Sequence, residues 1–238
     1  SADITLQYDA LNRLTNMVDA VGTTRYSHGS VGQLLSEDGP WSDDTVSYGY
    51  SNRLRSAASV LRPNASAWAV SYGYDAARRL TNVTSGAGAF GYQYVAGRQS
   101  LVSKLTVPGS SYITNHYDSV ARLLFTKMLD AGASVLDAET YSYNPGNQRT
   151  QQVFTAGNYV DYAYDDIGQL KTAKGKESGG TSRALEQLGY TYDSAGNLNW
   201  RTNNAFVQTF NVDTLNELTT VTRSGTRTVT DVTSGTWC

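Results

Sequence analysis

Aromatic positions alternate with small or polar ones in short segments along the chain. Six segments contain two tyrosines separated by a single small or polar residue: Tyr48/Tyr50, Tyr72/Tyr74, Tyr92/Tyr94, Tyr141/Tyr143, Tyr162/Tyr164 and Tyr190/Tyr192. Residues i and i+2 of a strand point to the same face, whereas in a helix they point to different sides. The spacing therefore predicts β-strands with one aromatic face.

A turn is predicted directly after the second aromatic residue. Asp commonly follows, and its side chain can accept backbone N–H bonds in an Asx-turn. Gly or Asn stands near the end of the turn, where a positive φ is tolerated: Asn12, Gly32, Gly168, Gly196 and Asn216. A segment of alternating apolar and polar residues comes next, as in 14–18, 80–84 and 218–222. Each unit is therefore predicted to be a β-hairpin.

This hairpin pattern occurs ten times at intervals of 20 to 28 residues. The second aromatic position, here called the anchor, is occupied by Tyr8, His28, Tyr50, Tyr74, Tyr94, Tyr117, Tyr143, Tyr164, Tyr192 and Val212. Such repetition predicts an array in which each hairpin pairs with its neighbours. After Tyr50 the chain runs straight into Asn52-Arg53-Leu54, so this turn is expected to be two residues short. We expect one all-β domain, 1–238, with about ten repeats and about twenty antiparallel strands.

The motif resembles that of the YD-repeat, or rearrangement-hotspot (Rhs), family. Its clearest copies are Tyr74-Asp75-Ala76-Ala77-Arg78-Arg79-Leu80, Tyr164-Asp165-Asp166-Ile167-Gly168-Gln169-Leu170 and Tyr192-Asp193-Ser194-Ala195-Gly196-Asn197-Leu198, and the similarity extends from about Leu6 to about Thr222. The family includes bacterial Rhs toxins, C components of insecticidal Tc toxins and animal teneurins. The resemblance implies tandem β-hairpins in a continuous antiparallel sheet that spirals or curls into part of a hollow shell.

The resemblance also implies a function and a set of structural residues. The shell would enclose polypeptide cargo or mediate adhesion, as a segment of a secreted or cell-surface bacterial protein. Expected partners are the rest of a larger YD-repeat shell, the cargo, or a second copy bound through the open sheet edges. The repeat-structural residues are Tyr8, Asp9, Tyr74, Asp75, Tyr117, Asp118, Tyr164, Asp165, Gly168, Tyr192, Asp193 and Gly196.

Composition narrows the possible partners. The net charge of −2 provides no broad positive field for nucleic acid. No apolar run approaches the roughly 18 residues that a membrane-spanning helix needs. The two histidines, His28 and His116, are too few for a multi-histidine metal site, and the single cysteine, Cys238, excludes an intramolecular disulfide. We therefore predict no metal and no cofactor.

Catalysis is the less favoured interpretation of the acidic residues. Two turn carboxylates could in principle act together in glycoside cleavage, so a glycosidase-like hydrolase is one alternative. A catalytic pair requires two special carboxylates, however, whereas here one Asp recurs at the same motif position. Each Asp is thus expected to cap its own turn, and no catalytic residue is predicted.

Exposed aromatic residues suggest a second alternative, a carbohydrate-binding module. Aromatic rings present an apolar face with a polar handle and are suited to stacking on sugars. The candidate glycan-binding residues are Trp41, Trp68, Tyr48 and Tyr72. Trp41 and Trp68 are expected in segments between repeats, where ligand contacts are common. The competing interpretation is that the tyrosines stack between neighbouring strands and hold the sheet together.

Overall fold

The hairpin interpretation is confirmed. A computed structural model describes residues 3–98 and 100–226, so that Cys238 lies outside the described part. These residues form twenty strands of one antiparallel sheet and contain no helix. The strands are β1 (Thr5–Tyr8), β2 (Leu14–Val18), β3 (Thr23–His28), β4 (Leu34–Asp38), β5 (Val46–Ser51), β6 (Leu54–Arg62), β7 (Ala65–Tyr74), β8 (Leu80–Ser85), β9 (Gly88–Tyr94), β10 (Val102–Thr106), β11 (Tyr112–Tyr117), β12 (Leu123–Leu129), β13 (Val135–Tyr143), β14 (Arg149–Phe154), β15 (Tyr159–Tyr164), β16 (Leu170–Lys176), β17 (Ser182–Tyr192), β18 (Leu198–Asn203), β19 (Phe206–Val212) and β20 (Leu218–Ser224).

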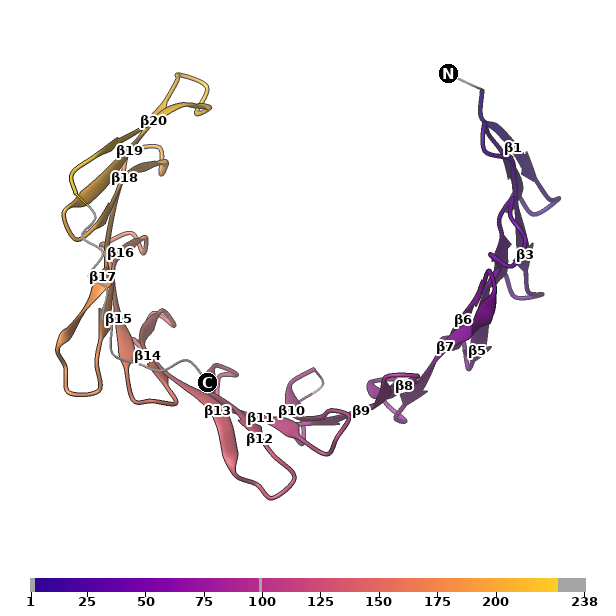
Figure 1. Ribbon diagram of the computed structural model, residues 1–238, viewed down its shortest axis with the longest axis horizontal. Coiled ribbons are helices and arrows are strands. Elements are labelled where there is room, and N and C mark those ends of the chain that lie inside the picture. Colours follow the sequence, from indigo (N-terminus) through magenta and orange to yellow (C-terminus); the bar gives the residue numbers. More distant parts are fainter. Residues whose placement is uncertain (1–2, 99, 227–238) are drawn as a thin grey trace. The chain divides into compact units, whose positions relative to one another are not determined.

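Anchor residues mark the ends of the odd-numbered strands. Nine of these strands end at the anchor itself, and β5 ends one residue later, at Ser51. The even-numbered strand that follows starts at the motif leucine in most repeats, for example Leu14 in β2 and Leu170 in β16. Figure 1 shows the strands following one another in chain order. The local sequence pattern therefore defines both arms of each hairpin.

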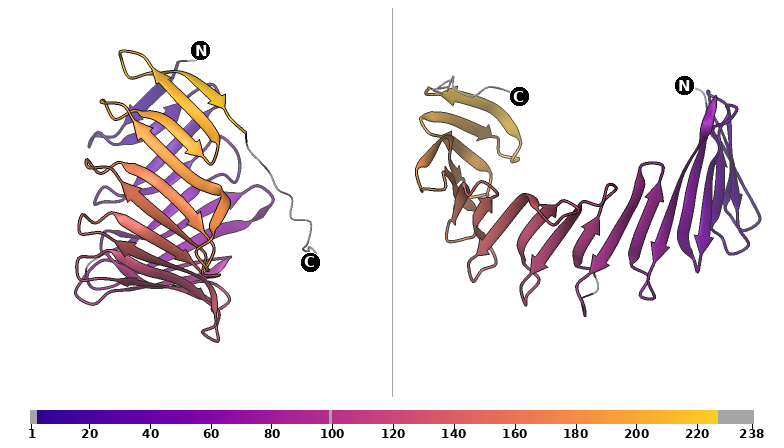
Figure 2. Two further views of the ribbon diagram at one scale, coloured as in Figure 1. Left: turned by 90° about the vertical axis from the view of Figure 1, so that its left-hand side faces the viewer. Right: turned by 60° about the horizontal axis from the view of Figure 1, so that its bottom comes forward.

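The strands fall into two compact units. One contains β1 to β10, the part of β11 up to Asn115, and Met128–Ser134; the other contains His116–Lys127 and the strands from Val135 onward. In the first unit, successive strands from β1 to β11 pair antiparallel, and in the second the strands from β13 to β20 do the same. Within each unit, successive hairpins therefore dock against one another (Figure 2).

A β-bulge recurs beside the anchor. Tyr74 pairs with Leu80, but the preceding Gly73 pairs with Asn82, so Thr81 has no partner across the hairpin. The same shift occurs at other anchors, including Tyr8, Tyr164 and Tyr192. The bulge brings Leu80 and Val83 onto the face of Tyr72 and Tyr74. Simple alternation along the even strands, as expected from the sequence, is therefore wrong at their first residues.

The strip is one layer thick and has almost no core. Among the described residues only Val70, Tyr141 and Ala173 are buried hydrophobic residues, and no large side chain is fully buried. The sheet formed by the described residues is open, as in part of a repeat shell. Hairpin-to-hairpin contacts must therefore supply most of the stabilisation.

Candidate functional sites at the repeat junctions

Six of the repeat turns are organised by their own Asp. The Oδ1 atom of Asp9 accepts hydrogen bonds from the backbone N–H groups of Leu11 at 2.9 Å and Arg13 at 3.0 Å. Turn Asp carboxylates in the other repeats accept equivalent backbone bonds from within their own turns: Asp75, Asp118, Asp165, Asp193 and Asp213. These bonds keep the carboxylates engaged in holding the turns.

Such bonds lower the pKa of Asp9, Asp75 and Asp193. The backbone N–H and side-chain guanidinium of Arg13 lower the pKa of Asp9 to about 2. Hydrogen bonds from the backbone and side chain of Arg79 also lower the pKa of Asp75, and those from the side chain and backbone of Asn197 lower that of Asp193. A general acid at neutral pH needs a raised pKa instead. These shifts are therefore those of structural carboxylates.

In four repeats, the residue after the positive-φ position connects one turn to the next. Arg13 forms an ion pair with Asp9 at 2.6 Å and donates from Nη1 to the carbonyl of Gly29 in the following turn at 3.0 Å. Gln148 donates to the carbonyl of Gly168 at 3.1 Å. Two further junctions are bridged by Arg122 to Asn144 and by Asn197 to Asn216. At these four junctions the residue of this motif position thus links adjacent turns.

Anchor tyrosines form a second set of links between repeats. The hydroxyl of Tyr164 donates to the carbonyl of Arg149, the residue that pairs with anchor Tyr143 in the preceding hairpin, at 2.8 Å. The corresponding bonds are Tyr74 to Arg55, Tyr94 to Leu80, Tyr143 to Leu123 and Tyr192 to Leu170, at 2.7 to 3.0 Å. The anchor therefore closes its own hairpin and also ties it to the previous one.

A polar network interrupts the aromatic face in the second unit. The hydroxyl of Tyr141 donates to Glu139, which also accepts a bond from Gln152 at 3.0 Å, while Tyr162 donates to Gln152 at 3.1 Å. Burial, together with the bond to Glu139, raises the pKa of Tyr141 to about 12. The guanidinium of Arg149 lies 3.9 Å from the centre of the Tyr141 ring. The tyrosines of this face thus make both polar and ring contacts between strands.

The four candidate glycan-binding residues lie in different settings. Trp41 is in the loop between β4 and β5 and is 65% exposed, as the sequence predicts for a segment between repeats. Trp68 is 44% exposed but lies within β7, paired with Val60, so its expected place outside the strands is wrong. Tyr48 donates to Glu37 at 2.8 Å. Tyr72 is half-buried and lines a cavity described below.

Both histidines lie in the sheet. His28 ends β3 and pairs with Leu34, which is the register of an anchor residue. His116, in β11, stacks on Phe125 with ring centroids 5.2 Å apart. Within residues 3–98 and 100–226, no three His, Cys, Asp or Glu side chains gather as a metal-binding group. The described part of the chain also contains no helix that is long and apolar enough to cross a bilayer.

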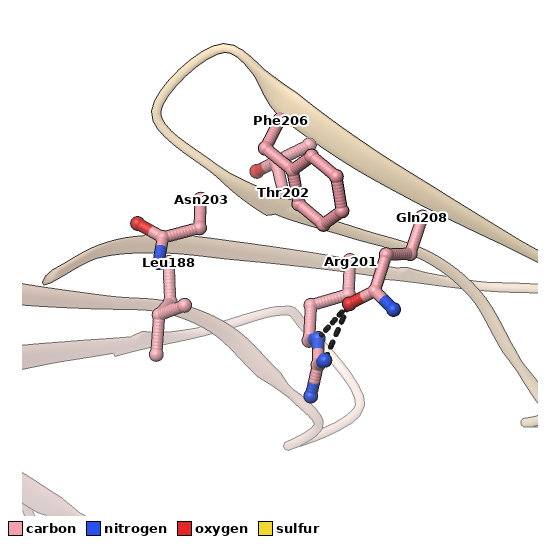
Figure 3. Close-up of a pocket in the computed structure, with 6 residues that line it drawn as sticks. All are labelled: Leu188, Arg201, Thr202, Asn203, Phe206 and Gln208. Carbon is pink, nitrogen blue, oxygen red and sulfur yellow. Dashed lines mark hydrogen bonds between the residues drawn. The ribbon is translucent and has the colours of Figure 1, made fainter. Parts of the chain in front are cut away.

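Two cavities were not evident from the sequence. The first, of about 230 Å³, is lined by Leu188, Arg201, Asn203, Phe206 and Gln208, among others (Figure 3). Arg201 donates to the side-chain oxygen of Gln208, and Asn203 Oδ1 is buried without a hydrogen-bond partner in the described structure. The second cavity, of about 410 Å³, lies between the β5–β6 and β7–β8 turns. Its only sequence signal was the shortened turn after Tyr50.

Comparisons with solved structures agree on the fold. The chain is similar to a crystal structure of TcdB2-TccC3-Cdc42, with 15% identity, a TM-score of 0.59 and 90% of this chain covered. A crystal structure of TcdB2-TccC3-TEV gives 14% identity, a TM-score of 0.58 and the same coverage. This chain spans only 12% of the length of either matched chain. No protein-family model and no curated protein matches it.

Proposed function

We propose that this chain is a non-catalytic scaffold, a segment of a hollow YD-repeat shell that encloses polypeptide cargo or mediates adhesion. The shell would belong to a secreted or cell-surface bacterial protein. The observation that carries this proposal is the continuity between repeats, because anchor hydroxyls such as that of Tyr164 bond to the backbone of the preceding hairpin. Any further hairpin of the same motif can dock in the same way, which lets a wall grow by repetition.

The thinness of the sheet also supports the proposed role as the wall of a shell. A single layer with three buried hydrophobic residues leaves its aromatic rings half-exposed in the described structure, as in Tyr72 and Tyr162. An enclosed polypeptide could contact such a face, because tyrosine offers apolar area together with a hydroxyl. The similarity to TcdB2-TccC3 structures supports the sheet architecture, and the share of 12% fits a segment of a larger assembly.

The hydrolase alternative receives less support. A glycosidase needs a carboxylic acid of raised pKa near a second free carboxylate. In contrast, the turn carboxylates accept backbone hydrogen bonds within their own turns, and the pKa of Asp9 is lowered to about 2.

The test uses the full-length protein that carries these repeats. Electron cryo-microscopy should show a hollow particle with a wall one sheet thick, and polypeptide inside it should resist added protease until the wall is denatured. A solid particle, or a strip covered by a second protein layer, would contradict the proposal. Protease sensitivity of all enclosed segments in an intact particle would remove the encapsulating role.

A further inference from the structure

A notch interrupts the row of turns where the repeat motif is shortened. The β5–β6 turn consists of Asn52 and Arg53, with φ values of 51° and 66°, the conformation of a two-residue hairpin turn. The next turn in the row, Asp75 to Arg79, has the usual length. Because two residues are missing from the first turn, its neighbour stands beside a gap of about 410 Å³.

Within the described residues, side chains do not link the two turns at this junction. Elsewhere, Arg13 and Gln148 donate across to the following turn. In the part of the chain that the structure describes, no side chain of the short turn bonds to the Asp75–Arg79 turn. Only the anchor bond remains below the gap, from the hydroxyl of Tyr74 to the carbonyl of Arg55 at 2.8 Å. The two hairpins are thus joined by the anchor bond.

The notch is lined by polar groups that are free to bind a ligand. Ser51, Asn52 and Ser56 line it, and their side chains make no hydrogen bond within residues 3–98 and 100–226. The Tyr72 hydroxyl is likewise unbonded within these residues, and its ring forms part of the wall. Hydroxyl and amide groups beside an aromatic ring match the alternating hydroxyls and apolar faces of a sugar.

The charged residues of the lining favour a sugar that carries a negative charge. The carboxylate of Asp75 is paired with Arg79 at 2.7 Å. Arg78, also in the lining, makes no ion pair within the described residues, so it supplies the one uncompensated charge of the notch. A guanidinium binds carboxylates well because its fork of donors matches their two oxygens.

We propose that this notch binds a single sugar residue that carries a carboxylate, a uronic acid. Arg78 pairs with the carboxylate, the serines and Asn52 bond to the ring hydroxyls, and Tyr72 provides the apolar wall. A volume of about 410 Å³ is within the range of small-molecule sites and accommodates one such residue. The site lies wholly in the first unit and requires no other component of a shell.

Ligand-observed saturation-transfer NMR on the full chain tests this site with glucuronic acid and glucose as a matched pair. Saturation should transfer to glucuronic acid and not to glucose. In protein-observed spectra recorded with glucuronic acid, the amide shifts should concentrate at residues 51–56 and 75–78. N-acetylaspartate, which carries two carboxylates but no sugar ring, should give no transfer. Transfer to neither sugar, equal transfer to both, or equal transfer to N-acetylaspartate would overturn the proposal.

Two variants separate the site from general charge. Arg78→Gly removes the guanidinium at a position with φ of 62°, where glycine is favoured, so the turn should stay folded. We expect it to weaken glucuronic acid binding roughly tenfold, the loss typical of a charged hydrogen bond. Arg53→Gly is the control, since Arg53 has the same charge and a φ of 66° but does not line the notch. Equal loss in both variants would refute the role of Arg78.

Discussion

At the scale of single residues, the tyrosines of one repeat have two separate roles. The hydroxyl of anchor Tyr192 donates to the carbonyl of Leu170 in the preceding hairpin at 3.0 Å. Tyr190, two residues earlier on the same strand and face, makes no hydroxyl bond within the described residues. The anchor hydroxyl therefore acts between repeats, whereas the first aromatic residue contributes its ring.

This difference can be measured by removing one oxygen atom. Tyr192→Phe should lower the free energy of unfolding by about 0.5–1.5 kcal/mol, because it removes a half-buried hydrogen bond while retaining the ring. Tyr190→Phe is the matched control and should change stability by less than roughly 0.5 kcal/mol. Urea denaturation of the three proteins gives the comparison. Equal effects of the two substitutions would contradict an inter-repeat role for the anchor.

At the scale of the hairpin, one turn position requires a positive φ. Gly32, Gly168 and Gly196 occupy it with φ of 85° to 91°, as their residue type predicts. Ala121 occupies the same position with φ of 71°, although a Cβ atom is unfavourable there. The fold thus imposes the turn conformation on a residue that does not favour it, because the flanking strands fix both ends of the turn.

Substitutions at this position should change stability in opposite directions. Gly32→Ala should destabilise by about 1 kcal/mol through backbone strain alone, since no atom lies within 4 Å of the added Cβ. Ala121→Gly should stabilise by roughly 0.5 kcal/mol, because relief of strain exceeds the added entropy of the unfolded chain. Thermal unfolding of both variants measures the signs. Destabilisation by Ala121→Gly would show that the conformation carries no strain.

At the scale of the whole molecule, stability is distributed along the strip. In the described residues few side chains are buried and no central core couples distant repeats, so neighbouring hairpins are held by strand pairing and, at several junctions, by anchor hydroxyls and turn links. An array of this kind behaves as a sum of repeat and nearest-neighbour terms. Local opening should therefore remain local.

Hydrogen exchange of Gly32→Ala tests this locality. Amides in β2 to β5 should exchange faster than in the parent protein, because they flank the strained turn. Amides in β15 to β18 should keep their protection. Mass spectrometry of peptides from both regions resolves the two effects. A uniform increase in exchange along the chain would indicate a single cooperative unit instead.

The sequence by itself determined the strands, the turns and the order of pairing. Strand and turn preferences are local: Tyr-x-Tyr fixes one face of a strand, and Asp with a later Gly or Asn defines the turn, as in Asp165 and Gly168. Repetition then makes pairing between neighbours the simplest way to bury each hairpin. The shortened turn at Asn52 was visible for the same local reason.

Only the tertiary structure decided which groups meet between hairpins. The bulge at Thr81 shifts the phase of the even strand, so face assignments by strict alternation fail there. Partners such as Tyr164 and Arg149 are 15 residues apart, and their contact depends on the register of two hairpins. The notch beside Arg78 likewise depends on the neighbouring turn. Local patterns do not encode such register, because pairing and packing across the sheet determine it.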